Sequence, residues 1–399
     1  MAKKTIADVD VKGKRVLMRV DFNVPIEAGK VTDDKRIVEA LPSIKYILDN
    51  GARSLVLMSH LGRPKGPQDK AKYSMKPAAD RLGELLGKPV KLAPDVIGPE
   101  VRKMVDSLQP GEVLMLENLR IYEAETKNNK DFAKELASYG DLYVNDAFGT
   151  SHRAHASMHA VPEIMGPGKR VAGFLIKKEL DFLGDALTNP KRPFVAILGG
   201  AKVSDKIGVI ESLLKKADDI IVGGAMAYTF FAGRNQNVGA SLVELDKTQE
   251  ALRLEAEAGG KLHLPVDTVA IQAGEIKAGA LYEVVRGSIP DDKQGVDIGP
   301  ETREMFAKVI AKARTIFWNG PMGVFEKEPF DAGTVAVAKA VAEATSKGAI
   351  SVIGGGDSAA AIAKAGLEDK VSHISTGGGA SLEFVQGLEL PGIEILDNK

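Results

Sequence analysis

One local pattern repeats along the chain: a short apolar, β-branched run, then a polar or glycine-rich turn, then an amphipathic stretch with helical spacing. Nearly all the apolar runs are continuous rather than alternating in polarity, which is typical of strands buried on both faces of a parallel sheet. The pattern therefore predicts an α/β protein with helices on both faces of parallel sheets. The predicted strands span residues 15–20, 54–58, 113–116, 142–144, 194–198, 220–222, 315–318, 349–353 and 371–375, and the predicted helices include residues 36–48, 203–216, 301–313 and 334–344.

Composition narrows the class of function. The 399 residues include 53 Lys and Arg against 54 Asp and Glu, so a net charge of −1 gives no global attraction to nucleic acid or to an anionic membrane. The absence of Cys excludes disulfide scaffolds, thiolate nucleophiles, zinc–thiolate sites and iron–sulfur clusters. The first residues form no signal-peptide core, and the longest uncharged stretch, residues 220–233, is shorter than the about 20 residues of a membrane span. We therefore expect a cytoplasmic protein with local anion sites.

The chain length predicts two domains, at about 150 residues per domain. Residues 177–192 form a charged amphipathic stretch that ends in prolines, which predicts a linker helix or hinge between domains 1–176 and 193–389. The strand-end turns of the first half carry Asp, Asn, His and Arg, whereas those of the second half carry mostly Gly, Lys and Asp. We therefore expect a small-anion site in the first domain and a nucleotide site in the second.

In open parallel sheets, ligands bind beyond the carboxyl ends of the strands. In the first half these turns supply guanidinium groups, which suit phosphate and carboxylate, together with His60 and His152. Asp21 and Asn23 beside an anion favour a ligand with a hydroxyl group, so the turns indicate a hydroxylated phospho-acid. For any single residue, the alternative is a helix cap or an ordinary surface side chain. The predicted cage consists of Arg36, Arg63, Arg120 and Arg153.

Three histidines of the same half could also form a metal site. The spacing of His152, His155 and His159 fits ligands on one helix face. However, Arg153 would repel a cation, and no acidic residue shares the spacing. The charge of the neighbourhood therefore favours an anion.

Five strand-end turns of the second half are rich in glycine; they contain Gly199, Gly223, Gly320, Gly354 and Gly377. Glycine lets backbone N–H groups close on phosphate oxygens, and a following helix N-terminus adds a favourable dipole. These turns therefore predict a polyphosphate site.

Three side chains strengthen that prediction. Lys202 and Lys206 lie four residues apart at the expected opening of one helix, so both can point at the same end of a ligand. Asp357 stands at an expected helix start, where it is either a capping residue or, beside phosphates, a Mg²⁺ ligand.

These turns differ from two other nucleotide-binding motifs. No Gly-Lys-Ser/Thr sequence occurs, which excludes a P-loop NTPase. Gly354, Gly356 and Ala359 match the loose dinucleotide fingerprint, but the next predicted strand ends without an acidic residue for the ribose. An NAD-dependent dehydrogenase and a non-catalytic phosphometabolite-binding protein stay open as alternatives, although the latter has no use for Lys202 and Asp357.

Six motifs, in order along essentially the whole chain, closely resemble those of the phosphoglycerate kinase family: residues 19–25, 59–64, 117–120, 200–206, 318–321 and 354–358. The resemblance implies two Rossmann-like domains joined by a helical hinge, a monomeric state, and a return of residues 390–399 to the first domain. It also implies a glycolytic reaction: reversible, Mg²⁺-dependent phosphoryl transfer between 1,3-bisphosphoglycerate plus ADP and 3-phosphoglycerate plus ATP. Both nucleophiles are already ionised, so no general base is expected.

The resemblance also implies roles for individual residues. The phospho-acid would bind Asp21, Asn23, Arg36, His60, Leu61, Gly62, Arg63, Arg120 and Arg153. ATP or ADP would bind Lys202, Lys206, Gly223, Gly224, Gly295, Asn319, Pro321, Glu326, Gly355, Gly356, Asp357 and Ser358, with Glu326 at the ribose and Asp357 as the ligand of Mg²⁺. Catalysis would depend on Arg36, Lys202, Gly355 and Gly378.

Overall fold

The structure, a computed structural model, describes residues 2–399. The chain forms two compact units. The first contains the residues up to Asp181 together with Glu389–Lys399, and the second contains Phe182–Leu388. The second unit thus begins inside residues 177–192, the stretch interpreted from sequence as a linker.

Helix α7 (Phe174–Thr188) spans the boundary of the units. It begins three residues before the predicted linker 177–192 and ends before Pro190, which lacks the N–H group that a helix needs. Its start is fixed by Asp146, whose Oδ1 accepts hydrogen bonds from two first-turn N–H groups at 2.9 and 3.2 Å. Helix α7 is therefore shifted toward the N-terminus relative to the stretch 177–192.

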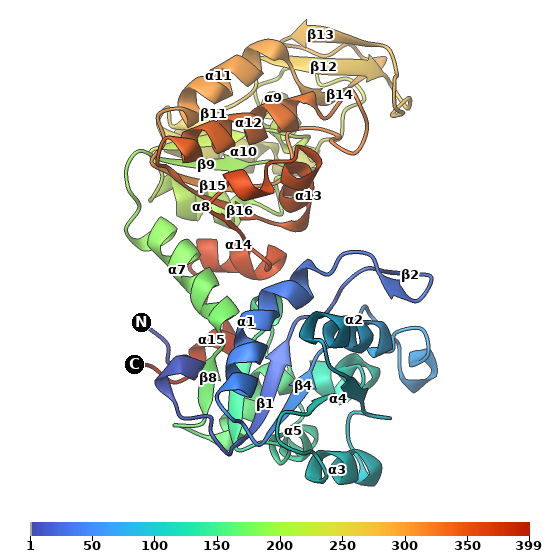
Figure 1. Ribbon diagram of the computed structural model, residues 1–399. Coiled ribbons are helices and arrows are strands. Elements are labelled where there is room, and N and C mark those ends of the chain that lie inside the picture. The colour runs from blue at the N-terminus through green and yellow to red at the C-terminus, as the bar shows by residue number, and fades with distance from the viewer. Residues whose placement is uncertain (1) are drawn as a thin grey trace. The chain divides into compact units, whose positions relative to one another are not determined.

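The first unit is built on a six-stranded parallel sheet in the order β5-β6-β4-β1-β7-β8 (Figure 1). Its strands are β1 (Arg15–Val20), β4 (Ser54–Met58), β5 (Val90–Leu92), β6 (Val113–Met115), β7 (Leu142–Asp146) and β8 (Arg170–Ala172). Its helices are α1 (Lys35–Asp49), α2 (Lys76–Leu86), α3 (Pro99–Asp106), α4 (Glu123–Thr126), α5 (Lys130–Ala137), α6 (Val161–Met165) and α15 (Pro391–Glu394). The remaining elements are the hairpin of β2 (Ile26–Glu27) and β3 (Lys30–Val31), the short 3₁₀ helices η1 (Ile6–Asp8), η2 (Pro67–Asp69), η3 (Leu119–Ile121) and η4 (Phe148–Thr150), and the π-helix η5 (Ala156–Ala160).

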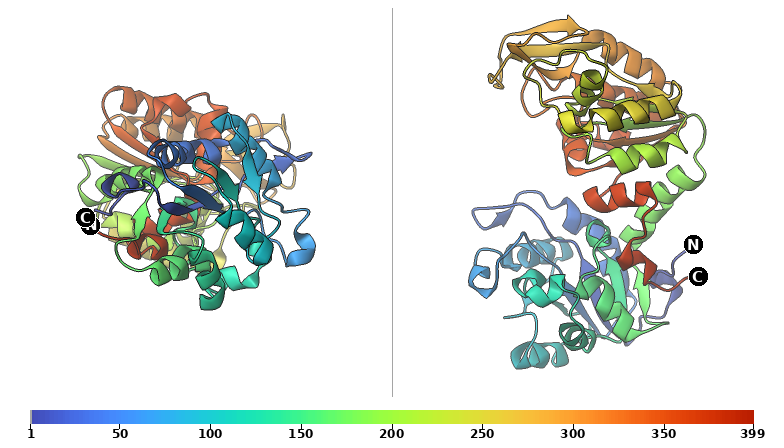
Figure 2. Two further views of the ribbon diagram at one scale, coloured as in Figure 1. Left: turned by 60° about the horizontal axis from the view of Figure 1, so that its bottom comes forward. Right: turned by 180° about the vertical axis from the view of Figure 1, so that it is seen from behind.

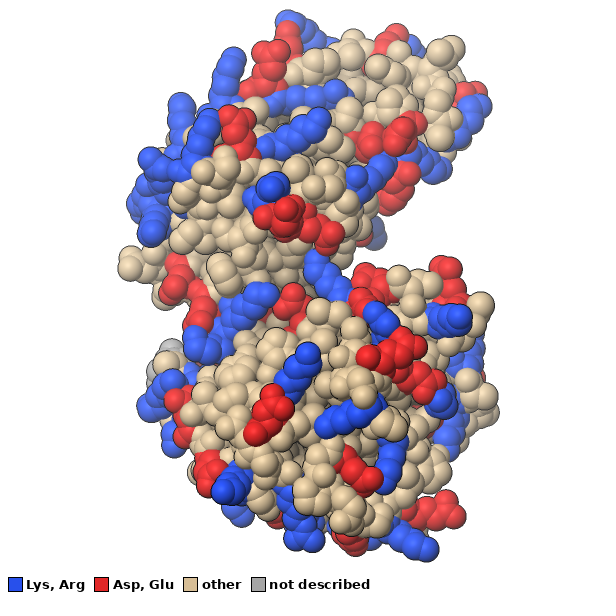
Figure 3. Space-filling view, in the orientation of Figure 1, with Lys and Arg blue, Asp and Glu red and all other residues tan. Residues whose placement is uncertain are grey.

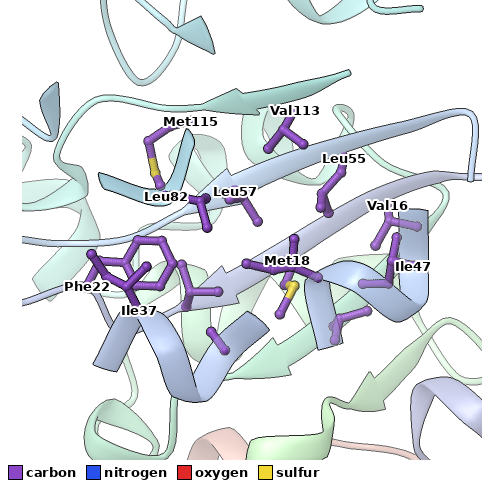
Figure 4. Packing of buried hydrophobic residues seen from close by; sticks show 14 of the residues in the cluster. Val16, Met18, Phe22, Ile37, Ile47, Leu55, Leu57, Leu82, Val113 and Met115 are labelled. Atoms are coloured by element: carbon purple, nitrogen blue, oxygen red, sulfur yellow. The ribbon is translucent and has the colours of Figure 1, made fainter. Parts of the chain in front are cut away.

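One core of this unit lies between the sheet and helices α1 and α2 (Figure 4). Val16 and Met18 of β1 point to this face and pack with Ile37 and Ile47 of α1. All four side chains are fully buried. Because successive strand residues alternate between faces, Arg19 points to the opposite face, where its side chain contacts η5.

The two ends of the chain lie side by side in the first unit (Figure 2). Lys3 and Asn398 form an antiparallel bridge. Helix α15 is anchored to the segment after β7 through Gly392, whose N–H donates to Ser151 O at 2.9 Å. The C-terminal segment therefore completes the first unit.

The second unit contains a six-stranded parallel sheet in the order β11-β10-β9-β15-β16-β17. Its strands are β9 (Phe194–Leu198), β10 (Asp219–Val222), β11 (Leu262–His263), β15 (Thr315–Asn319), β16 (Ile350–Gly354) and β17 (His373–Ile374). Its helices are α8 (Ile207–Leu214), α9 (Met226–Gly233), α10 (Thr248–Ala258), α11 (Pro300–Ile310), α12 (Ala332–Ser346), α13 (Gly356–Lys364) and α14 (Gly378–Gln386), with the short turns η6 (Leu245–Lys247) and η7 (Glu368–Lys370). The two parallel sheets confirm the predicted fold class.

A three-stranded antiparallel sheet in the second unit was not predicted from sequence. It consists of β12 (Asp267–Gln272), β13 (Tyr282–Arg286) and β14 (Lys293–Ile298), with β12 in the middle. Most residues of β13 are exposed, so this strand lacks the continuous apolar run used to recognise the others. The short edge strands β5, β8 and β11 were missed as well.

Acidic and basic side chains are interspersed over each unit on the face drawn in Figure 3, in keeping with the net charge of −1. Within residues 2–399, no helix has the length and apolar content needed to cross a membrane.

Candidate functional site

The turn after β1 meets the start of α1 in the first unit. Arg36 Nη1 donates to Asp21 Oδ2 at 3.1 Å and to the carbonyl oxygen of Asn23 at 3.2 Å. The Asp21 carboxylate is largely buried, whereas the Arg36 side chain is about one-third exposed. The guanidinium is therefore held from one side and keeps further N–H donors for a ligand.

The turns after β4 and β6 join the same cluster. Asn23 Oδ1 accepts a hydrogen bond from the Gly62 N–H at 2.8 Å, and the Gly62 carbonyl accepts one from Arg120 Nη1 at 3.1 Å. Asn118 Nδ2 donates to the Leu61 carbonyl at 2.7 Å. Gly62 has a φ of +59°, and a Cβ there would lie 2.5 Å from the ring of Tyr73, so only glycine fits this turn.

A pocket of about 750 Å³ opens beside this cluster. Three of the four predicted arginines line it, and Arg36 is not among its lining residues. Its walls are formed by Arg63, Pro64, Lys65, Gly66, Pro67, Arg120, Ile121, Glu123, Thr126, Arg153 and His155. The pocket is therefore basic and suits a small polyanion.

Positive charges are crowded around this pocket. Burial, together with the charges of Arg19 and Arg153, lowers the pKa of Arg120 to about 10. Burial and the charge of Arg120 lower the pKa of His155 to about 4, so this histidine is neutral at pH 7. An anion in the pocket would relieve the repulsion. Within residues 2–399, no group of three or more His, Asp or Glu side chains is arranged to hold a metal ion. The three histidines considered from sequence, His152, His155 and His159, therefore form no such group.

The glycine turns of the second unit divide into two kinds. The N–H groups of Gly199, Gly200 and Gly224 donate to the carbonyl oxygens of Asn319, Pro321 and Met322 at 2.9–3.1 Å. Those of Gly223 and Gly320 donate to the Leu198 carbonyl and to Ser358 Oγ. The N–H groups of these turns already have hydrogen-bond partners within the protein, so we call them the scaffold turns.

The geometry of the scaffold turns explains why they need glycine. A Cβ on Gly199 would lie 2.1 Å from Pro321 O, and one on Gly320, whose φ is +101°, would lie 2.2 Å from Gly199 O. The turns after β9 and β15 are therefore packed backbone against backbone.

The other two turns begin helices α13 and α14. First-turn N–H groups of a helix have no partner within the helix, which leaves those of Gly356 and Gly378 available to a ligand. A Cβ on Gly378 would lie 3.9 Å from the Cα of Gly355, so the two turns adjoin. The backbone hydrogen bonds therefore distinguish the two turns with open N–H groups from the three turns whose N–H groups have partners.

Lys202 lies outside the helix that it was predicted to open, whereas Lys206 is the N-cap of that helix, α8. Helix α8 begins at Ile207, because the Glu244 carboxylate accepts hydrogen bonds from the Ser204 N–H at 2.9 Å and from its hydroxyl at 2.5 Å. This clasp holds residues 203–206 in a turn. Lys202 is consequently exposed, whereas Lys206 is buried.

Lys206 is tied to the end of β15. Its Nζ donates to Asn319 Oδ1, and Asn319 Nδ2 donates to the Gly354 carbonyl at 2.8 Å. Burial lowers the pKa of Lys206 to about 8, although the carboxylates of Asp205 and Asp357 oppose the shift. A phosphate beside this ammonium would favour its charged form.

The remaining predicted nucleotide residues differ in their surroundings. Asp357 is exposed in the first turn of α13, and the N-cap is Gly355, so the capping interpretation of Asp357 is wrong. Ser358 is buried and accepts the hydrogen bond of Gly320, which gives it a structural contact. Glu326 is exposed beyond β15. Gly295 lies in β14, where a Cβ would meet the hydroxyl of a tyrosine at 2.1 Å.

Sequence reasoning missed four residues that support these sites: Arg19, Glu125, Ser157 and Glu244. Arg19 carried a signal, because a charged residue stands in an otherwise apolar strand. Glu125, Ser157 and Glu244 act through contacts with residues distant in the sequence, and no local pattern marks them.

The sequence pattern of the phosphoglycerate kinase family matches residues 6–388. The chain belongs to this family. The phosphoglycerate kinases of Chloroherpeton thalassium and Thermosipho africanus are 58% and 55% identical to it over 401 and 404 residues, covering 100% of this chain and 100% and 99% of theirs.

Solved structures agree with this family. The phosphoglycerate kinase of Coxiella burnetii is similar with a TM-score of 0.86 at 39% identity, and that of Pyrococcus horikoshii OT3 with a TM-score of 0.85 at 34% identity. Each match covers 98% of both chains. The family makes the chain a phosphotransferase of glycolysis, and the dehydrogenase and the non-catalytic binding protein are not favoured.

Proposed function

We propose that the chain transfers a phosphoryl group reversibly between 1,3-bisphosphoglycerate and ADP, giving 3-phosphoglycerate and ATP, with Mg²⁺ bound to the nucleotide. One observation carries the proposal: this member of the family has an arginine-lined pocket in its first unit and two adjoining helix N-termini in its second unit. The first suits a phospho-acid, and the second suits a polyphosphate.

The phospho-acid is proposed to bind the first unit. Arg63, Arg120 and Arg153 supply charge for its phosphate, and Asp21 and Asn23 supply oxygen atoms for its hydroxyl group. The other proposed contacts come from Arg36, His60, Leu61 and Gly62.

The nucleotide is proposed to bind the second unit. Lys202 and Lys206 contact its phosphates, and the open N–H groups at the starts of α13 and α14 bind phosphate oxygens. Glu326 contacts the ribose. The remaining proposed contacts come from Gly223, Gly224, Gly295, Asn319, Pro321, Gly355, Gly356 and Ser358, of which Ser358 acts through the Gly320 turn.

The mechanism needs charge cancellation rather than a general base. The attacking carboxylate, or the attacking phosphate of ADP, is already ionised. Arg36, Lys202 and the N–H groups of Gly355 and Gly378 are proposed to stabilise the charge of the phosphoryl group during transfer. Water must be excluded, since it would otherwise hydrolyse the acyl phosphate.

The residues present fit a Mg²⁺ ion that arrives with the nucleotide. Asp357 is an exposed carboxylate beside the open end of α13, and Mg²⁺ is commonly held by one or two carboxylates together with substrate phosphates and waters. When bound, Mg²⁺ neutralises phosphate charge. Asp357 would hold the ion, and Lys206 would contact the phosphates. The Asp357 carboxylate favours the charged form of Lys206 by raising its pKa.

The Asp357→Asn variant is expected to need about tenfold or more Mg²⁺ for half-maximal activity, because a carboxylate ligand becomes a neutral amide. The measurement is the initial rate against free Mg²⁺ at saturating ATP. The matched control is Asp369→Asn, which removes an exposed carboxylate in η7 and should leave the Mg²⁺ dependence unchanged. A deficit that no Mg²⁺ concentration relieves would remove Asp357 from the metal site.

We also propose that the two units close during transfer. The supporting observation is that the two sets of ligand residues belong to different units, with α7 continuous across their boundary. Only a complex with both ligands gives both units something to bind. The radius of gyration from small-angle scattering should therefore fall more with both ligands than with either alone. An equal radius in all forms of a fully active enzyme would contradict closure.

The working enzyme is proposed to be a cytoplasmic monomer without nucleic-acid or membrane partners, since the balanced charge gives no attraction to either.

The test of the function itself is a direct assay. Purified protein with Mg²⁺, ATP and 3-phosphoglycerate should release ADP and form an acyl phosphate, which hydroxylamine traps as a hydroxamate. Omission of 3-phosphoglycerate should leave only background ADP release. Oxidation or reduction of added NAD(H), or binding of 3-phosphoglycerate without any transfer, would instead support one of the other two classes.

A further inference from the structure

His60 lies at the carboxyl end of β4 and is almost completely buried. Its Nδ1 faces Arg19 Nη2 at 3.1 Å and Asp21 Oδ1 at 3.9 Å. These neighbours make opposite demands. A guanidinium has only donors, so it can bond only to an Nδ1 without a proton, whereas a carboxylate would require a proton on Nδ1. The distances decide between them, because 3.1 Å is within hydrogen-bond range and 3.9 Å is not.

The guanidinium of Arg19 is fixed in place. It is fully buried, its Nε donates to Ser157 Oγ at 2.9 Å, and its Nη1 donates to the Val20 carbonyl. The Ser157 hydroxyl donates in turn to Glu125 Oε1 at 2.6 Å, and the Ser157 N–H donates to Oε2 at 2.9 Å. The buried Glu125 therefore supplies the countercharge through one hydroxyl group, and the Arg19 side chain is fully shielded from solvent.

The Asp21 carboxylate is occupied elsewhere. Its Oδ2 accepts from Arg36 at 3.1 Å, and its Oδ1 accepts from the Asn23 N–H at 3.3 Å. Burial and the cationic neighbours hold the pKa of His60 well below its usual value. The titratable groups around His60 are Arg19 of β1, Asp21 after β1, Arg36 of α1, Arg120 of η3 and His155 before η5.

We propose that Arg19 is a positioning residue that holds His60 as a neutral imidazole whose only proton is on Nε2. In this state His60 contributes one uncharged N–H donor to an anion held by Arg120, and the arginines alone supply the charge. A proton on Nδ1 would place an N–H group against the N–H groups of Arg19, so His60 does not act as a pH switch between pH 5.5 and 8.5. The role toward the phospho-acid rests on the proposed function, whereas the tautomer does not.

The first test uses the wild-type chain without ligand. Long-range ¹H–¹⁵N spectra resolve the ring nitrogens of its six histidines, and the His60→Gln variant assigns the signals of His60. From pH 5.5 to 8.5 we expect a constant unprotonated Nδ1 and a constant protonated Nε2. The control is the urea-unfolded chain, in which His60 should titrate near pH 6.5. A protonated Nδ1 in the folded chain, as the other tautomer or as imidazolium, would overturn the proposal.

The second test assigns the cause to Arg19. Arg19→Lys keeps a cation that can only donate, so His60 should keep its Nε2 proton. Arg19→Gln removes the cation and adds an amide oxygen that can accept from Nδ1, so the share of His60 with a proton on Nδ1 should rise and its pKa should move up toward the usual value. A protonated His60 would be a charged donor, and charged donors bind anions about twice as strongly as neutral ones. The KM of Arg19→Gln for 3-phosphoglycerate, taken relative to that of the wild type at the same pH, should therefore fall at least about threefold from pH 8 to pH 6, while kcat changes little.

The outcomes are distinguishable. A folded Arg19→Gln chain in which His60 keeps the wild-type tautomer and does not titrate would remove Arg19 as the cause and overturn the proposal. If the glutamine variant does not fold, the wild-type spectra and Arg19→Lys still decide. A wild-type chain with the expected tautomer but no kinase activity would contradict the proposed function and leave the positioning role of Arg19 standing.

Discussion

Replacement of Arg36 by alanine should lower kcat by about 10³-fold or more, with a much smaller change in the KM for 3-phosphoglycerate. An arginine that stabilises a transferring phosphoryl group contributes on this scale. Arg36 does not line the basic pocket, and its Nη1 is held by Asp21 at 3.1 Å, so its other N–H donors are oriented apart from the three arginines that line the pocket. An interaction made only in the transition state lowers kcat and leaves ground-state binding intact.

Steady-state kinetics in the direction of ATP consumption provides the measurement. Arg120→Ala is the matched comparison, because Arg120 lines the pocket and its loss should mainly raise the KM for 3-phosphoglycerate. Thermal unfolding of the Arg36→Ala variant controls for the loss of the contact with Asp21. If kcat stays near the wild-type value and only KM rises, Arg36 belongs to the binding cage instead.

The strands were predictable where burial on both faces leaves a continuous apolar run. Residues 15–20 and 194–198 are strands with the bounds that the sequence indicated. The same rule failed for β13, because an exposed edge strand of an antiparallel sheet needs no such run. Helix ends were less predictable. The expected helix start at residue 203 moved to Ile207 because Glu244, about 40 residues further along the chain, holds Ser204 in a turn.

The sequence predicted which residue types make up the candidate site, but not which turns have N–H groups open to a ligand. Composition marks all the glycine turns as suited to phosphate, yet the backbone of Gly199 and Gly320 is used for packing against neighbouring turns, and the starts of α13 and α14 remain open. That division depends on hydrogen bonds between strands distant in sequence. The tautomer of His60 is a stronger case, since it is decided by a difference between two distances that no sequence pattern encodes.

The Lys202→Ala variant should lower kcat about 10²–10³-fold while leaving the melting temperature unchanged, because one preorganised donor to developing charge is lost. Lys202 is exposed, so its truncation opens no cavity and leaves no buried group unpaired. Lys206→Ala is a less clean experiment, since it removes the donor to Asn319 and disturbs the turn at the end of β15. Comparison of the two variants thus separates the loss of a catalytic donor at Lys202 from the structural disturbance at Lys206.

The control for Lys202→Ala is Lys215→Ala, which removes another exposed ammonium at the far end of α8 and should change kcat by less than about twofold. Turnover and the KM for ATP are measured for both variants at saturating Mg²⁺ and 3-phosphoglycerate. A wild-type kcat with a raised KM for ATP would assign Lys202 to ground-state nucleotide binding. A fall in kcat without a comparable rise in KM would place its ammonium on the phosphoryl group during transfer, because only an interaction that strengthens in the transition state separates the two constants in this way.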